Sequence, residues 1–71
     1  MKKINKGIGA VIKELRLNKN KSQEVLADES GYNDQTHLSN IENGKVDPGI
    51  KTVNKILKPL GCELVVMEIA E

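Results

Sequence analysis

The feature that most limits the fold of this chain is a set of apolar residues that recur every three or four positions within short segments. The residues with this spacing are Ile8, Val11, Ile12 and Leu15 near the start, and Ile50, Val53, Ile56, Leu57 and Leu60 near the end. Such a spacing is typical of an amphipathic helix that turns one face toward a core. Turn-forming residues separate the segments, so the pattern predicts several short helices.

Capping and turn residues indicate where these helices begin and end. Ser22 is suited to cap one helix, Gly31 to end it, and Asn33 or Asp34 to cap the next. The helices predicted in this way cover residues 5–17, 23–29, 35–43 and about 50–60.

The last segment has a different pattern. Pro59 weakens the preceding helix and Gly61 stops it. Residues 63–69, "ELVVMEI", are rich in β-branched side chains and carry apolar groups on both alternating faces. We therefore expect a short β-strand. Because its own chain offers only the short lysine-rich start as a partner, we expect this strand to pair with a second copy of itself.

The size and cysteine content narrow the class of protein. A chain of 71 residues is expected to form one domain that buries only about 60% of the surface of the unfolded chain. Its single cysteine, Cys62, cannot form a disulfide within the chain, and no apolar run is typical of a signal peptide or a membrane span. We expect a cytoplasmic protein that does not insert into a membrane.

The charges are unevenly distributed although the net charge is only +1. Residues 1–21 carry seven Lys or Arg against one Glu, and the remaining residues carry four Lys against nine carboxylates. A chain polarised in this way can present a positive surface to phosphate. The alternative is that these lysines only solvate the first helix.

The predicted helix 35–43 has an unusual polar face. Leu38 and Ile41 lie on one side, and uncharged polar side chains occupy an arc of about 140° on the other. Those side chains are Gln35, Thr36, Ser39, Asn40 and Asn43. Amide and hydroxyl groups match the donors and acceptors of base edges in the major groove of DNA. The alternative is that this polar face is simply exposed to solvent and binds nothing, although a solvent-exposed helix face more usually carries Lys and Glu.

Residues 12–48 resemble the Cro/repressor-type (XRE) helix-turn-helix domain. The segment "SQEVLA" corresponds to the family pattern SQ-x-x-LA, Leu38 and Ser39 to the centre of its recognition helix, and "IENGK" to its loop signature. The resemblance implies a compact, all-α fold of four to five helices over residues 1–61. Residues 62–71 would then form the C-terminal strand and tail of the same domain, used for dimerisation.

The resemblance also implies roles for individual residues. Gln23 is expected at a phosphate, and the residues expected at base edges are Gln35, Thr36, Ser39 and Asn40. Asn43 and Lys45 are expected to clamp the DNA backbone. His37 has no second metal-ligating residue at a suitable spacing, and we expect it to contact the DNA backbone or solvent.

One ion pair and two departures complete the comparison with the family. The family pairs Arg16 with Glu42, and Glu42 lies at the edge of the apolar side of its helix, where a carboxylate needs a partner. The turn "GYND" is one residue longer than usual, which leaves open whether Gln35 or Thr36 points deepest into DNA. Lys21 stands at a position where the family commonly has an apolar residue. Its side chain is expected either to lie along the protein surface or to contact a phosphate.

The sequence thus predicts a transcriptional regulator, acting as a repressor, that binds a two-fold operator in double-stranded DNA as a homodimer. We expect no catalytic residue, no cofactor and no metal. A second function class stays open, because small domains of this family also resemble antitoxins that neutralise a toxin protein and autoregulate their operon. An enzyme ranks third, since no motif indicates a substrate.

Overall fold

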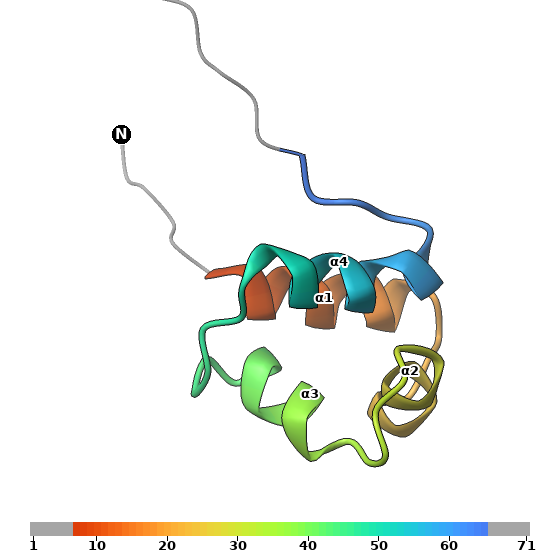
Figure 1. Cartoon of the computed structure of the whole chain (residues 1–71). Coiled ribbons are helices and arrows are strands. Elements are labelled where there is room, and N and C mark those ends of the chain that lie inside the picture. The colour runs from red at the N-terminus through yellow and green to blue at the C-terminus, as the bar shows by residue number, and fades with distance from the viewer. Residues whose placement is uncertain (1–6, 66–71) are drawn as a thin grey trace, which may run out of the picture.

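Four short α-helices and one 3-10 helix make up the part of the chain that the structure describes. The computed structural model describes residues 7–65 (Figure 1). The elements are α1 (Gly7–Asn18), α2 (Gln23–Glu29), α3 (Thr36–Glu42), α4 (Ile50–Leu57) and the 3-10 helix η1 (Lys58–Leu60). The predicted helical fold is confirmed over these residues. None of the helices between residues 7 and 65 has the length and apolar composition needed to cross a membrane.

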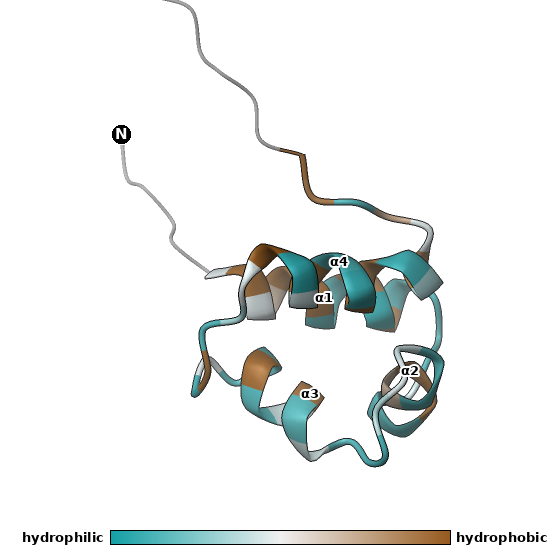
Figure 2. Ribbon diagram, viewed as in Figure 1, coloured by the Kyte–Doolittle hydropathy of each residue, from teal (hydrophilic) through white to brown (hydrophobic). Residues whose placement is uncertain are grey.

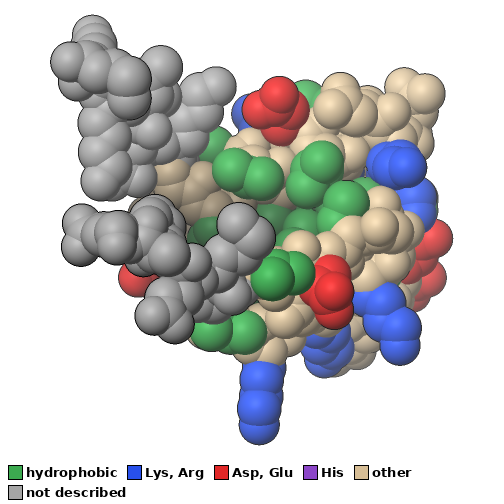
Figure 3. All heavy atoms as spheres, turned by 90° about the horizontal axis from the view of Figure 1, so that it is seen from above, with side chains coloured by type: hydrophobic (Ala, Val, Ile, Leu, Met, Phe, Trp, Pro, Cys, Tyr) green, Lys and Arg blue, Asp and Glu red, His purple; other side chains and the backbone are tan. Residues whose placement is uncertain are grey.

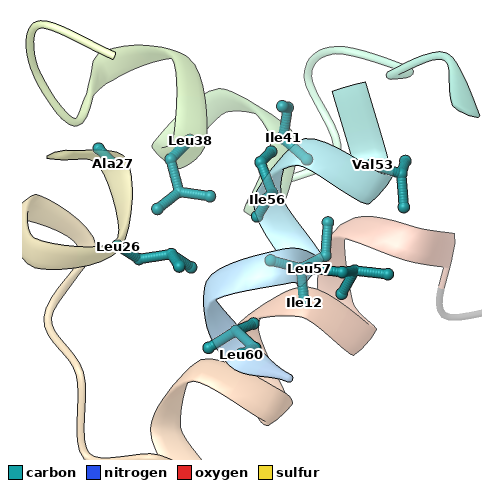
Figure 4. Close-up of a cluster of buried hydrophobic side chains, with 9 residues drawn as sticks. All are labelled: Ile12, Leu26, Ala27, Leu38, Ile41, Val53, Ile56, Leu57 and Leu60. Carbon is teal, nitrogen blue, oxygen red and sulfur yellow. The ribbon is translucent and has the colours of Figure 1, made fainter. Parts of the chain in front are cut away.

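The helices enclose a small aliphatic core. α1 packs against α3 and α4, and α2 packs against the same two helices. All four helices and η1 contribute buried side chains, which Figure 4 shows converging on one another. The nine residues are Ile12, Leu26, Ala27, Leu38, Ile41, Val53, Ile56, Leu57 and Leu60. The apolar sides predicted for the first, third and fourth helices therefore face the core, with two exceptions. Val11 and Ile50 were predicted on those sides and are 42% and 58% exposed.

The predicted boundaries of α2 are confirmed, and one of the two residues predicted to cap the next helix does so. The hydroxyl of Ser22 accepts a hydrogen bond from the Val25 N–H at 3.1 Å, so this side chain caps α2. Gly31 follows the helix with φ +87°, a conformation that favours glycine. The carboxylate of Asp34 accepts from the Thr36 N–H at 2.9 Å, so Asp34, and not Asn33, satisfies the first turn of α3.

Two other helices differ from the prediction by small amounts. α3 is one residue shorter at each end than the predicted 35–43, because Gln35 and Asn43 occupy the cap positions. α1 extends one residue further, to Asn18, and residues 5 and 6 of the predicted helix lie outside the described residues.

The predicted helix 50–60 is split in two. It remains α-helical to Leu57 and continues as the 3-10 helix η1. Pro59 has no N–H to donate to the carbonyl four residues earlier, so the α-helical pattern cannot continue through it. Gly61 then ends the segment with φ +70°, as predicted.

The β-strand predicted over residues 63–69 is not formed in its described part. Residues 62–65 belong to no helix or strand, and residues 66–69 lie outside the described residues. The physical reason is that no other strand lies within reach in the described chain. The backbone N–H of Leu64 instead donates to the side-chain oxygen of Asn54 in α4 at 2.8 Å.

Gly9 brings the backbones of α1 and α3 into direct contact. Gly9 is buried, and a Cβ at this position would meet the carbonyl oxygen of Ile41 and lie 2.9 Å from its carbonyl carbon. Because a backbone carbonyl cannot rotate away as a side chain can, only glycine fits without moving α3. The helix that carries the polar face is therefore positioned by a residue at the start of the chain.

We predict that Gly9→Ala lowers the free energy of unfolding by about 3 kcal/mol, the upper end of the range for overpacked cores. Urea denaturation of the full chain measures this change. Gly49→Ala is the matched control, because a Cβ at Gly49 meets nothing within 4 Å, and we expect a loss of about 1 kcal/mol or less. Equal losses for the two variants would show that α1 and α3 are not in backbone contact.

Candidate nucleic-acid interface

α2, the turn after Gly31 and α3 place one polar helix on the outside of the molecule. In Figure 1, α3 lies below α1 and α4. Leu38 and Ile41 of α3 are fully buried, which turns its remaining sides outward. Figure 2 shows the same division, with hydrophobic colour on the part of α3 that faces the core and hydrophilic colour elsewhere. The outward side of α3 is therefore free to enter a groove of DNA.

The structure brings the predicted base-reading residues together along α3. Gln35 and Thr36 are exposed at the start of the helix, and Ser39 and Asn40 are half-buried one turn later. Gln35 is the residue that precedes the first turn, and Thr36 is the first residue within it. Gln35 and Thr36, the two residues that follow the longer turn, are therefore both accessible to solvent at the N-terminal end of α3. This is the end of the helix that is expected to approach the bases.

The predicted backbone clamp begins where α3 ends. Asn43 is exposed, and its side-chain amide donates to the hydroxyl of Ser39 at 3.4 Å, one helical turn earlier. Its backbone N–H also donates to the carbonyl of Ser39 at 3.0 Å. Lys45 is exposed two residues further on, after Gly44, whose φ is +77°. Asn43 and Lys45 thus extend the polar side of α3 into the following loop.

His37 is placed differently from the other residues of this group. It is half-buried, and its ring centre lies 5.0 Å from that of Tyr32, with an angle of 55° between the rings. The ammonium of Lys55 in α4 lies 4.7 Å from the centre of the Tyr32 ring, a distance typical of a cation–π contact. His37 therefore also packs on the turn between α2 and α3, a contact that the sequence did not indicate.

A buried ion pair joins α1 to α3 behind the polar face. The guanidinium of Arg16 donates to both carboxylate oxygens of Glu42, from Nε at 2.8 Å and from Nη2 at 3.0 Å. Its third nitrogen, Nη1, donates to the carbonyl of Lys21 at 2.7 Å. Both residues are buried, and this two-point geometry fixes their relative orientation. The structure thus brings Arg16 and Glu42 together as the resemblance implied.

Gln23 joins the same cluster. Its side-chain amide donates to Oε1 of Glu42 at 3.0 Å, which links the first residue of α2 to the last residue of α3. The second N–H and the carbonyl oxygen of this amide have no hydrogen bond within the described residues. Sequence reasoning placed Gln23 at a phosphate and missed this bond, because residues 23 and 42 are joined only by the fold.

Lys21 follows the surface and does not project outward as a phosphate ligand. Its ammonium donates to the carboxylate of Glu29 at 2.7 Å and to the backbone carbonyl of Pro59 at 3.1 Å. Of the two alternatives for Lys21, the structure therefore shows the first. Among the four basic residues described between residues 7 and 21, Arg16 and Lys21 are thus engaged in internal contacts.

The surface next to α3, formed by α2 and the turn that follows it, contains a groove with acidic residues. A groove of about 250 Å³ lies between α2 and the turn, lined by Glu24, Val25, Asp28, Tyr32, Asn33 and Asp34. Three of these six residues are acidic, so phosphates are repelled on this side of the turn. The exposed and half-buried residues between Gln35 and Lys45, in contrast, include no Asp or Glu.

Comparison with known proteins adds two findings. A family model described as "Helix-turn-helix" matches residues 12–67. The chain is 36% identical over 66 residues to the "ImmF control region 10 kDa protein" of Bacillus phage phi105, an alignment that covers 93% of this chain and 72% of the phage protein. Both matches include the two helices and the turn described above.

We predict that Glu42→Ala lowers the free energy of unfolding by about 3 kcal/mol, because it leaves the charge of Arg16 buried without its carboxylate. Replacing both residues by apolar ones of similar volume should cost less, since no unpaired charge remains. Thermal unfolding monitored by circular dichroism measures both effects. The control is Glu29→Ala, which breaks the more exposed pair with Lys21 and should cost about 1 kcal/mol or less. A melting temperature for Glu42→Ala equal to that of the parent would refute a stabilising role for the pair.

Proposed function

The chain belongs to the XRE-type helix-turn-helix family of DNA-binding transcriptional regulators, and from this premise we propose that it represses transcription as a homodimer on a two-fold operator. The observation that supports the proposal best is the uncharged polar side of α3, which lies opposite the core. α3 lies in the major groove in this proposal, with its first turn nearest the bases.

The residues of this face divide into two roles. Gln35, Thr36, Ser39 and Asn40 read base edges, since amides pair well with adenine and hydroxyls can meet several bases. Gln23, His37, Asn43 and Lys45 contact the phosphate backbone and hold α3 in register with the bases. The bond from Gln23 to Glu42 supports its role, because it holds the amide at the start of α2 while one N–H stays free for phosphate.

Repression is proposed from the kind of relative that the chain matches. The similar phage protein is described as a control-region protein, and we propose the same kind of role for this chain. A domain that occupies its operator blocks access to the promoter without any further activity. Two copies joined through residues 63–69 would set their recognition helices about one DNA turn, roughly 34 Å, apart.

A second candidate function is that of an antitoxin that binds a toxin protein and also represses its own operon. The observation that favours it is the exposure of apolar residues away from α3, among them Ile50 at 58% and Val65 at 62%. Co-expression with the product of a neighbouring toxin-like reading frame tests it, and a stable complex of the two chains is the expected result.

We predict that Gln35→Ala and Asn40→Ala each weaken binding to the operator by about 1–3 kcal/mol and relax the preference at particular base pairs. Sites selected from random DNA provide the operator, and fluorescence anisotropy measures the affinity. Lys45→Ala is the contrasting variant, since loss of a phosphate contact weakens binding to all sequences and flattens the salt dependence. If Gln35→Ala bound the selected site as tightly as the parent, this assignment of the reading face would be wrong.

We predict that a chain ending after Val65 is a monomer that keeps its helices but binds the operator more weakly, because each half-site is then bound alone. The truncation ends there because Cys62 and Leu64 pack against the core and have to be retained. Sedimentation of the truncated and full chains at equal concentrations measures the assembly. A truncated chain that still dimerises would refute assembly through the C-terminal residues.

A further inference from the structure

A carboxylate lies at the start of α3, directly before the first of the base-reading residues. Asp34 precedes Gln35, and its Oδ1 accepts a hydrogen bond from the Thr36 N–H at 2.9 Å. The first N–H groups of a helix point along its axis and away from the helix. The carboxylate of Asp34 therefore lies over the end of α3 and not on one of its sides. This is the end that the proposed function places nearest the bases.

The face of the molecule over α1 and α4 does not compete with α3 for base edges. Seen from above, hydrophobic side chains gather in the middle of this face, and Lys and Arg lie toward its rim (Figure 3). Val11 of α1 and Ile50 of α4 are 42% and 58% exposed. Such side chains offer no donor or acceptor to a base. The bases are therefore expected on the side of α3, where Asp34 lies.

The carboxylate of Asp34 has a second oxygen that the described residues do not satisfy. Oδ1 is used in the bond to Thr36, whereas Oδ2 has no hydrogen bond to any residue between 7 and 65. The two ion pairs of this part of the chain are Arg16 with Glu42 and Lys21 with Glu29, so neither includes Asp34. Asp34 is exposed. The end of α3 thus presents an acceptor, held in place by the bond to Thr36, to whatever approaches it.

The charge of Asp34 excludes the DNA backbone as its partner. Asp34 lines the groove beside α2 together with Glu24 and Asp28. Phosphates carry the same sign of charge as these three carboxylates and are repelled by them. A partner for Oδ2 in DNA must therefore be a hydrogen-bond donor on the edge of a base.

Only two bases offer such a donor in the major groove. Cytosine presents its N4 amino group, and adenine presents its N6 amino group beside the acceptor N7. Guanine and thymine present acceptors, which repel a carboxylate oxygen. Cytosine therefore suits Asp34 best, because its amino group has no acceptor of the same base next to it.

We propose that Asp34 is a specificity-determining residue, whose Oδ2 accepts a hydrogen bond from the N4 amino group of a cytosine in the operator. The inference rests on the proposed function and names one base that the operator contains, next to the bases read by Gln35. Asp34 adds little affinity, because its charge also repels the DNA backbone. It acts chiefly by rejecting guanine and thymine at this position, which is a repulsive route to specificity.

The substitution Asp34→Asn tests the role of Oδ2 without removing the bond to Thr36. Asparagine makes the same turn as aspartate, but only its oxygen can accept from the Thr36 N–H, so its NH2 donor takes the place of Oδ2. A donor suits the acceptors of guanine, and cytosine should lose its advantage over guanine at one position of the sites selected from random DNA. Fluorescence anisotropy on operators that differ at that position should show the cytosine-to-guanine affinity ratio falling by about tenfold or more.

Two further variants separate base reading from charge and from folding. Asp28→Asn removes one charge from the α2 side of the same groove and should leave the preference at every position unchanged. Asp34→Ala removes the bond to Thr36 as well as the charge. It should lower the melting temperature, which Asp34→Asn should leave unchanged.

The outcomes distinguish a failure of this inference from a failure of the proposed function. The parent chain should select cytosine next to the positions whose preference changes in Gln35→Ala. Selection of another base there, or an Asp34→Asn chain that keeps the preference of the parent at every position, would overturn the role of Asp34 while operator binding still stands. Equal changes in Asp34→Asn and Asp28→Asn would also overturn it, because they would show a general effect of charge. A parent chain that selects no sequence from random DNA would refute the proposed function, and this inference with it.

Discussion

The buried contact between Arg16 and Glu42 is the interaction on which the arrangement of the helices depends. A domain of this size has a small core and a small net stability, so one unpaired buried charge can consume a large part of it. Here neither charge is left unpaired, because Glu42 accepts from Arg16 and Gln23, and Arg16 also donates to the backbone of Lys21. The hydrogen bonds of one ion pair thus join α1, α2, α3 and the connector between the first two. Apolar packing alone would hold these helices together with less definite orientation, because it has no direction.

The side of α1 that carries Arg16 also allows α3 to come close enough for Arg16 to reach Glu42. Gly9, Ile12 and Arg16 are the buried residues of α1, and their spacing places them on one side of the helix. Gly9 contacts the backbone of α3, Ile12 packs in the apolar core, and Arg16 forms the ion pair with Glu42. The three contacts depend on one another because they all lie between the same helices. Without the close approach at Gly9, the guanidinium could not reach the end of α3 in the same geometry. The polar side of α3 is left outward because its other side is fixed at these points.

The helices could be predicted from the sequence because their signals are local. Ser22 and Gly31 mark boundaries through hydrogen bonding and backbone conformation that involve only a few residues, and apolar spacing identifies the side that faces the core. The pairing of Arg16 with Glu42 came from the family resemblance and from the position of one carboxylate on its helix. What the sequence did not reveal depends on residues that only the fold brings together. The close approach of Gly9 to the backbone of Ile41, for example, joins residues that are 32 positions apart in the sequence. The bonds of Lys21 to Pro59 and of Gln23 to Glu42, and the C-terminal hydrogen bond to Asn54, are likewise contacts between distant segments.

α4 contacts both the turn between α2 and α3 and the described C-terminal segment. Its residue Lys55 lies over Tyr32 in the turn of the helix-turn-helix, and its neighbour Asn54 holds the backbone of Leu64. Consecutive residues of a helix point about 100° apart, so a single turn of α4 contacts both the DNA-binding turn and the C-terminal segment. A short helix whose other side is packed in the core has little freedom to bend between these contacts. The packing of α4 therefore fixes the position of α3 relative to the C-terminal segment within one copy. If two copies assemble through that segment, this rigid packing sets the distance between their two recognition helices.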